Sequence, residues 1–273
     1  MPKVGVGNIE IYYEVHGNGF PLVLISGASQ SSETWGAEIM ELSKHYRVVT
    51  FDNRGTGRSS APEGDYSIKT MGDDVAGLLD SLRISKAHIL GPSMGSMVAQ
   101  ELAINHPKKV NGLILVGTTP GGSVYDSIPG QREAHEKLRW MFAPPPDMPP
   151  EVLLEEIMRL CYTKEFFDKN KASIMAVKPP KYPTPLSTIE KQFNAVFKFD
   201  TYDRLKTISS RTLVIHGEDD RICMPEGARM LAKQIPNAEL KMFKQAGHGV
   251  LEEKWQEVKP AILDFLKRCD TCW

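Results

Sequence analysis

The sequence predicts an α/β fold in which a mostly parallel central sheet is flanked by helices and interrupted by an inserted helical segment. Short apolar runs alternate with amphipathic helical patterns over residues 21–117 and again over 211–266, as in βαβ units. Between these stretches, residues 120–202 have no strand-like runs and contain two proline-rich stretches. We therefore expect a core made of residues 1–119 and 203–273, with residues 120–202 as the insertion.

The elements before the insertion begin with a hairpin and continue as strand–helix units. Residues 3–6 and 9–15 are rich in β-branched and aromatic residues, and Gly7-Asn8 between them is a turn pair. The run PLVLIS at 21–26 is apolar throughout, as expected for a strand buried on both faces of a parallel sheet. We then expect a helix at 34–45, a strand at 47–52, a helix at 70–83, a strand at 87–90, a helix at 94–106 and a strand at 112–117.

The remaining elements return to the same alternation after the insertion. Pro260 must start or kink the last helix, because a proline inside a helix removes a hydrogen bond and clashes with the preceding turn. We expect helices at 152–161 and 187–197, a strand at 211–217, a helix at 226–235, a strand at 239–243 and a final amphipathic helix.

The composition argues against several classes of partner. The chain has 273 residues and a formal net charge of −1, from 33 basic and 34 acidic residues, so no charge excess attracts nucleic acid or an anionic membrane. No apolar stretch approaches the roughly 18 residues of a membrane span, and the first residues lack a signal-peptide pattern. We expect a cytoplasmic monomer or homodimer that binds neither nucleic acid nor a membrane.

The cysteines and glycines give no sign of a metal or cofactor. Four cysteines are scattered along the chain, which fits a reducing compartment. Cys269 and Cys272 form a single CxxC that trails a helix, whereas redox pairs lie at helix N-termini and zinc sites need further ligands. No phosphate-binding glycine loop stands out, so we predict neither a metal nor a cofactor.

The pattern Gly91-Pro92-Ser93-Met94-Gly95 is the strongest chemical signal in the chain. It matches G-x-S-x-G and lies directly between a short strand and a helix, as a nucleophile elbow does. Such a turn is tight, and glycines two positions before and after the serine avoid clashes with nearby backbone. We predict that Ser93 is a nucleophile; the alternative is a plain turn between a strand and a helix.

A serine hydroxyl is a poor nucleophile at neutral pH and needs a base. His248 lies in Gln-Ala-Gly-His-Gly, at the carboxyl end of a strand, where open α/β sheets hold their sites. We therefore predict His248 as the base. His216 is expected to pack against its strand and His106 to end a helix. No motif surrounds the other four histidines, which are expected to be structural or at the surface: His16, His45, His88 and His135.

The base needs an acid to orient it, and the oxyanion needs amide donors. Glu218, Asp219 and Asp220 follow the strand at 211–217, and chemistry alone leaves all three as candidates. The alternative for this cluster is a solvated loop paired with Arg221. The loop after the strand at 21–26 supplies the N–H of Ala28, which we predict to form an oxyanion hole together with that of Met94.

Several segments in the correct order resemble the α/β-hydrolase superfamily over essentially the whole chain. PLVLISGAS is similar to its oxyanion strand and loop, and FDNRGTGRSS to the segment after the next strand. GPSMGSMVAQELAINHP is similar to its elbow and helix, LVIHGEDDRICMP to its acid loop and QAGHGVLEE to its histidine loop. The acid of the family lies three positions after the glycine, so the resemblance selects Asp220.

The sequence differs from the family pattern at two positions, and it also resembles one branch of the family. The oxyanion loop often begins His-Gly in the family but is Ser26-Gly27 here, and Pro92 stands where an aromatic residue, His or Leu is common. An oxyanion loop without histidine is similar to those of the 3-oxoadipate enol-lactonase-like branch of the family. The segments RGTGRSS and SMGSM also resemble that branch. By analogy, residues 120–202 are expected to cap the active site, with Trp140 and Phe142 among the residues that bind substrate.

These features imply a cofactor-free serine hydrolase that cleaves a small carboxylic ester or lactone through a Ser93–His248–Asp220 triad and an acyl-enzyme. A serine at the elbow argues against the haloalkane dehalogenase and epoxide hydrolase relatives, which use an aspartate there. The same triad could serve a C–C bond hydrolase, a perhydrolase or a hydroxynitrile lyase. A ligand receptor with slow turnover on the same fold is the rival from another class.

Overall fold

The computed structural model describes residues 2–270 and has the expected α/β-hydrolase architecture. Within these residues, one eight-stranded sheet has the order β1-β2-β4-β3-β5-β6-β7-β8. β1 pairs antiparallel with β2, and β2 with β4, whereas all other neighbours are parallel. The strands are β1 (Lys3–Val6), β2 (Ile9–His16), β3 (Pro21–Leu24), β4 (Arg47–Phe51), β5 (Ala87–Pro92), β6 (Val110–Val116), β7 (Arg211–Gly217) and β8 (Ala238–Phe243).

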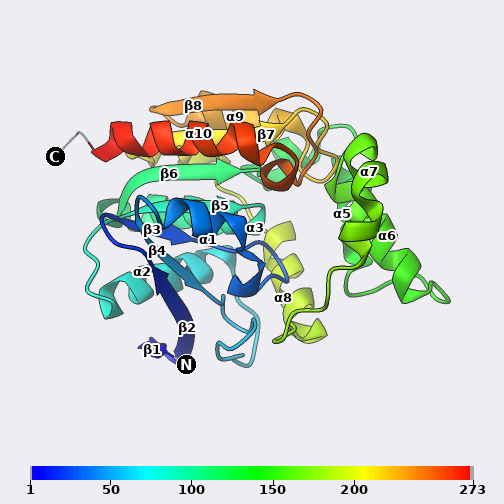
Figure 1. The fold of residues 1–273 in the computed structure, drawn as a ribbon, viewed down its shortest axis with the longest axis horizontal. Helices are drawn as coiled ribbons and strands as arrows, with labels where there is room; N and C mark the ends of the chain where they lie inside the picture. Colours follow the sequence, from blue (N-terminus) through cyan, green and yellow to red (C-terminus); the bar gives the residue numbers. More distant parts are fainter. Residues whose placement is uncertain (1, 271–273) are drawn as a thin grey trace.

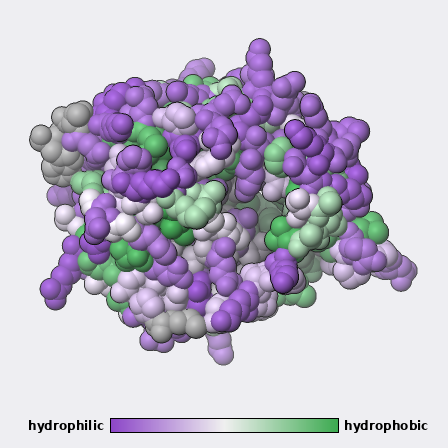
Figure 2. Space-filling model, viewed as in Figure 1, coloured by the Kyte–Doolittle hydropathy of each residue, from purple (hydrophilic) through white to green (hydrophobic). Residues whose placement is uncertain are grey.

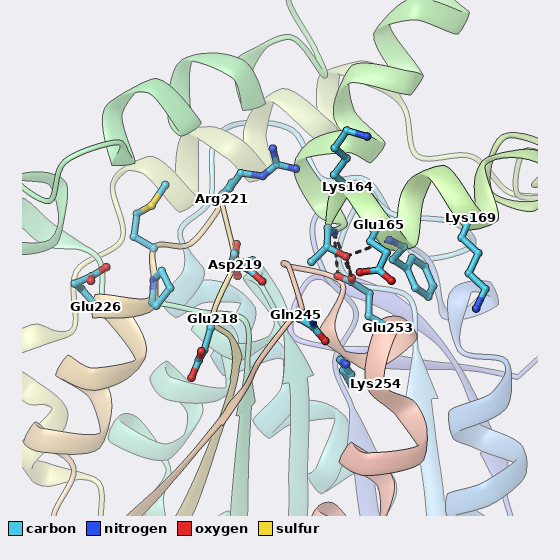
Figure 3. A pocket seen from close by; sticks show the side chains of 15 residues that line it. Lys164, Glu165, Lys169, Glu218, Asp219, Arg221, Glu226, Gln245, Glu253 and Lys254 are labelled. Carbon is cyan, nitrogen blue, oxygen red and sulfur yellow. Dashed lines mark hydrogen bonds between the residues drawn. The ribbon is translucent and has the colours of Figure 1, made fainter.

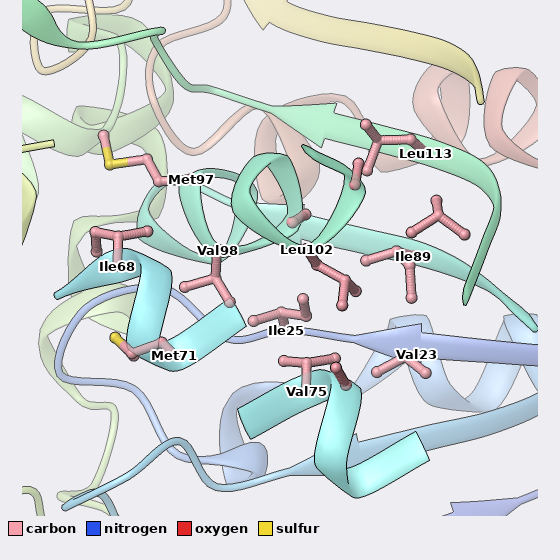
Figure 4. Close-up of a cluster of buried hydrophobic side chains, with 14 of the residues drawn as sticks. Val23, Ile25, Ile68, Met71, Val75, Ile89, Met97, Val98, Leu102 and Leu113 are labelled. Atoms are coloured by element: carbon pink, nitrogen blue, oxygen red, sulfur yellow. The ribbon is translucent and has the colours of Figure 1, made fainter. Parts of the chain in front are cut away.

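The central strands are buried on both faces, which explains why they are largely apolar. Helices α2 (Ile68–Ser81), α3 (Met94–Asn105) and α9 (Pro225–Gln234) cover one face, and α1 (Ala37–Leu42) and α10 (Val250–Asp270) cover the other (Figure 1). In β3, side chains alternate between the two apolar cores, as the period of a strand requires. Figure 4 shows the first of these cores, where Val23 and Ile89 of the sheet pack against Val75, Val98 and Leu102 of the helices.

Most of the expected helices begin and end within one or two residues of the expected positions, but two expectations about helices were not met. The helix expected at 34–45 is limited to α1, because a short 3-10 turn, Ser32–Thr34, precedes it. Pro260 lies inside α10, and the non-helical residue is Lys254, with φ −128° and ψ 26°. The helical part after Lys254 reaches Pro260 in its second turn, where the proline removes one hydrogen bond and causes no further break. The expectation that Pro260 starts or kinks the helix was therefore wrong.

The elements of residues 120–202 are helices, and they lie at the side toward which the parallel strands point (Figure 1). An isolated β-bridge between Gly121 and Asp200 joins the two ends of the segment. Its helices are α4 (Gly122–Asp126), α5 (Gln131–Arg139), α6 (Pro150–Cys161), α7 (Lys164–Met175) and α8 (Leu186–Phe197).

The end of α10 holds one of the two cysteines of the predicted CxxC. Cys269 is buried near the end of α10, and its predicted CxxC partner Cys272 lies outside the described residues. Over residues 2–270, no helix has both the length and the apolarity that a membrane crossing requires.

Candidate active site

The two loops predicted to hold the reaction lie where the strand order of the sheet reverses. From β3 the chain continues to β4 on one side, and it returns to β5 on the other side of β3. At such a switch point the following loops diverge and leave a crevice at the carboxyl ends of the strands. Ala28 follows β3 and Ser93 follows β5, so both predicted residues lie at this crevice.

The turn at Ser93 has the geometry that its glycines predicted. Ser93 has φ 52° and ψ −124°, a conformation that is uncommon for a non-glycine residue, and its N–H donates to Val116 O at 2.9 Å. A Cβ on Gly91 would lie 2.4 Å from the carbonyl carbon of Gly95. A Cβ on Gly95 would lie 2.0 Å from Ile25 O. The strained turn therefore depends on close backbone contacts that only glycine permits.

Gly95→Ala should lower the free energy of unfolding by about 3 kcal/mol, because the new methyl group collides with the backbone of the oxyanion strand. Urea unfolding followed by circular dichroism measures the change. Gly5→Ala is the matched control, since a Cβ at Gly5 meets nothing within 4 Å. Equal stability of the two variants would contradict the steric account of the turn.

His248 and Asp220 form a buried pair. His248 Nδ1 lies 2.9 Å from Asp220 Oδ2, and Asp220 Oδ1 accepts hydrogen bonds from the backbone N–H groups of Ile222 and Cys223 at 2.8 and 2.9 Å. The Asp220 side chain is fully buried and that of His248 is 13% exposed. Together with His216, four groups therefore contact the Asp220 carboxylate.

His216 also contacts the Asp220 carboxylate, which the sequence did not predict. The sequence suggested only that it packs against its strand, but its Nε2 lies 2.8 Å from Cys223 O and 3.2 Å from Asp220 Oδ2. Because a carbonyl oxygen can only accept, Nε2 carries the proton and can share it with the carboxylate. A histidine four residues before the acid, on the same strand end, was the available signal.

The pair has the electrostatics of a base with its orienting acid. Burial alone would raise the pKa of Asp220, but the charges and hydrogen bonds of His248 and His216 hold that pKa well below its usual range. Burial alone would lower the pKa of His248, but the charge and hydrogen bond of Asp220, with the charge of Glu252, raise it. At neutral pH the carboxylate is therefore ionised and holds the imidazole proton at Nδ1.

The other two acidic candidates point elsewhere. Glu218 and Asp219 are exposed and line an open, highly charged cleft of about 760 Å³ between the start of α7 and the loops after β7 and β8 (Figure 3). In this cleft Glu253 accepts hydrogen bonds from Thr163, through both its N–H and its hydroxyl. The cleft borders Asp220 from the outside, but neither Ser93 nor His248 lines it.

Ser93 and His248 instead line a smaller, more enclosed cavity of about 180 Å³ between the sheet and the helical segment. Figure 2 shows that the face in view is hollowed on the side of the helical segment, with apolar residues at the rim. No hydrogen bond joins the Ser93 hydroxyl to His248 within residues 2–270. Such contacts are often long in unliganded enzymes and shorten when substrate binds.

The predicted oxyanion donors line the same cavity. Both Ala28 and Met94 belong to its wall, and their backbone N–H groups have no hydrogen-bond acceptor among the described residues. Met94 is the first residue of α3, so its N–H also carries the partial positive charge of a helix N-terminus.

Neither of the two residues predicted to bind substrate, Trp140 and Phe142, lines this cavity, whereas other residues of the same segment do. Phe142 stacks on Phe193 at a ring distance of 5.8 Å. The side chains that α5, α6, α8 and the turn after α5 contribute are His135, Leu138, Met141, Ile157, Met158, Cys161, Phe193 and Val196. Helix docking decided which side of each helix faces inward, and sequence alone did not supply that information. Burial lowers the pKa of His135, which favours its neutral form.

The part of the chain that the structure describes offers no group of three or more His, Cys, Asp or Glu side chains arranged to hold a metal ion.

The chain is similar to proteins of the alpha/beta hydrolase family. A sequence profile of the alpha/beta hydrolase family matches residues 22–261. RutD of Caulobacter vibrioides, proposed in its name to be a carbamate hydrolase, is 28% identical over 276 residues, which cover 98% of this chain and 99% of RutD. An enol-lactonase from Burkholderia xenovorans superposes with a TM-score of 0.82 at 27% identity, covering 97% of this chain and all of the lactonase. A thermophilic esterase from Thermogutta terrifontis superposes with a TM-score of 0.82 at 26% identity, covering 98% of each chain.

Proposed function

Because the chain belongs to the alpha/beta hydrolase family, we propose that it hydrolyses a carboxylic ester or lactone without a cofactor, with Ser93, His248 and Asp220 as its triad. The observation that carries the proposal is the 2.9 Å contact between His248 Nδ1 and Asp220 Oδ2, with His248 and Ser93 on one enclosed cavity. The likeness to an enol-lactonase and an esterase supports the ester or lactone bond.

The reaction proceeds in two halves. Ser93 Oγ attacks the carbonyl carbon while His248 Nε2 accepts the hydroxyl proton, and the same proton then passes to the leaving alcohol as its C–O bond breaks. Water, deprotonated by His248, next attacks the acyl carbon. The bond to Ser93 Oγ then breaks as His248 returns the proton to that oxygen, and the acid is released. Asp220 keeps the imidazole in the required tautomer and stabilises its charged form. The N–H groups of Ala28 and Met94 stabilise the oxyanion in both halves.

We infer that residues 120–202 act as a cap that closes the acyl site. The cap supplies apolar side chains to the cavity, and no Lys, Arg, Asp or Glu side chain of residues 2–270 lines it. A dry cavity of about 150 Å³ holds benzene, so the volume of 180 Å³ suits an acyl group of a few carbon atoms. An unpaired carboxylate is costly to bury in such surroundings. The favoured acyl group is therefore small and uncharged.

This selectivity can be measured with a matched pair of substrates. The neutral p-nitrophenyl hexanoate should be hydrolysed with a kcat/KM at least about 30-fold higher than p-nitrophenyl hydrogen adipate, which has an acyl chain of the same six carbon atoms but ends in a free carboxylate that stays unpaired. Uncatalysed release of nitrophenol is subtracted for each ester. Equal rates on the two esters would contradict the uncharged-acyl assignment while leaving the hydrolase proposal intact.

Product analysis tests the proposed reaction itself. Purified protein is incubated with p-nitrophenyl esters of rising acyl length, a butyrolactone and a carbamate ester, the last because of the likeness to RutD. We expect stoichiometric acid and alcohol from the esters or the lactone. Turnover far below about 1 s⁻¹ on every ester and lactone, combined with tight binding of one of them, would favour the slow-turnover receptor.

A further inference from the structure

One buried amide on the helical segment holds the loop that carries the proposed oxyanion donor. Gln192 on α8 is fully buried, and its Oε1 accepts a hydrogen bond of 2.7 Å from the backbone N–H of Ser29. Its Nε2 donates to Thr56 Oγ1 at 2.9 Å, in the loop after β4. The side chain therefore bridges two core loops from a helix that lies 163 residues along the chain from Ser29. In Figure 1, α8 lies closer to the sheet than α6 and α7 do.

The loop needs such support because its backbone is strained. Ser29 has φ 62°, in the left-handed region that non-glycine residues rarely adopt. A second contact from the same segment fixes its other side, since Thr184 Oγ1 donates to Ser29 O at 2.9 Å. The N–H of Ser29 belongs to the peptide plane directly after Ala28, so these two bonds restrict the backbone angles that direct the Ala28 N–H.

We propose that Gln192 is a positioning residue that aims the Ala28 N–H at the oxyanion and thereby couples docking of α8 to turnover. The proposal rests on the proposed hydrolase function. When α8 is docked, the Ser29 N–H is held and the oxyanion hole is complete. When α8 is undocked, the strained loop loses two bonds and the donor leaves its position.

Gln192→Met keeps the length of the side chain and removes both hydrogen bonds. We expect kcat for p-nitrophenyl butyrate to fall about 10- to 100-fold, with KM changed by less than about threefold, because the displaced N–H matters only once the oxyanion forms. The inhibition constant of phenylboronic acid, which forms a tetrahedral adduct with a nucleophilic serine, should weaken by a similar factor. Gln192→Glu keeps an acceptor for the Ser29 N–H and should restore part of kcat.

Thr188→Val is the matched control, because Thr188 is buried on the same helix and packs against Gly55 without a bond to the oxyanion loop. We expect its kcat to equal that of the wild type. An unchanged kcat in Gln192→Met, or an equal loss in Thr188→Val, would overturn the proposal. Absence of hydrolysis and of boronate binding in the wild type would instead overturn the hydrolase function, so the two failures are distinguishable.

Discussion

Ser93→Ala should lower kcat for p-nitrophenyl butyrate by about 10⁴-fold or more, because it removes the only atom proposed to form the covalent intermediate. The turn that carries Ser93 is fixed by backbone contacts of Gly91 and Gly95, so the variant should keep its fold. Removal of a triad member leaves only the rate enhancement supplied by the oxyanion hole and by binding. Steady-state release of nitrophenol measures the change.

Ser123→Ala provides the control, since it makes the same chemical change at an exposed position on α4. Its kcat should match that of the wild type, and circular dichroism should show the same secondary structure in all three proteins. If Ser93→Ala retained more than a few per cent of the wild-type kcat, another group would have to be the nucleophile.

Asp220→Asn should lower kcat by about 10³- to 10⁴-fold, the scale seen when a triad aspartate is replaced by its amide. An asparagine amide can donate to Nδ1, which favours the imidazole tautomer that has its proton on Nε2 and cannot accept the Ser93 proton. The negative charge that raises the pKa of His248 is also lost. The neutral imidazole is then favoured, so the acidic limb of kcat/KM should move to lower pH.

The direction of the pH shift makes this prediction specific. In the wild type, activity should rise as pH increases through the pKa of His248, which Asp220 holds above the ordinary value of about 6.5. Asp219→Asn is the matched control, because Asp219 is adjacent, exposed and directed toward the outer cleft (Figure 3). A larger loss in Asp219→Asn than in Asp220→Asn would reverse the assignment of the acid.

The strands and the order of the reactive loops could be predicted from sequence because local patterns determine them. A central strand buried on both faces is apolar at most positions, as in LVLI at 22–25, whereas a strand with one face in water alternates apolar and polar residues. The elbow was equally predictable, since close backbone contacts demand glycine at 91 and 95. Among Glu218, Asp219 and Asp220, the residues alone left the acid open, and only the resemblance to the α/β-hydrolase superfamily selected Asp220.

The identity of the cavity-lining residues and the contacts of Gln192 depend on how elements far apart in the chain pack together. Trp140 and Phe142 are apolar and lie in the correct segment, but the docking of α5 turns His135 and Leu138 toward the cavity instead. Gln192 has no motif around it, and its contacts lie 136 and 163 residues away. Such roles follow from tertiary geometry, which composition and periodicity do not encode.

Mass spectrometry of the acyl-enzyme tests the central claim, that Ser93 is acylated during turnover, most directly. Asp220→Asn, whose deacylation should also be slow, is mixed with p-nitrophenyl butyrate, quenched in acid and digested with trypsin. The account predicts a butyryl group on the peptide of residues 87–108, placed by fragmentation at Ser93 and not at Ser96. Hydrolysis without an adduct there, or an adduct on another residue such as Cys161, would contradict it.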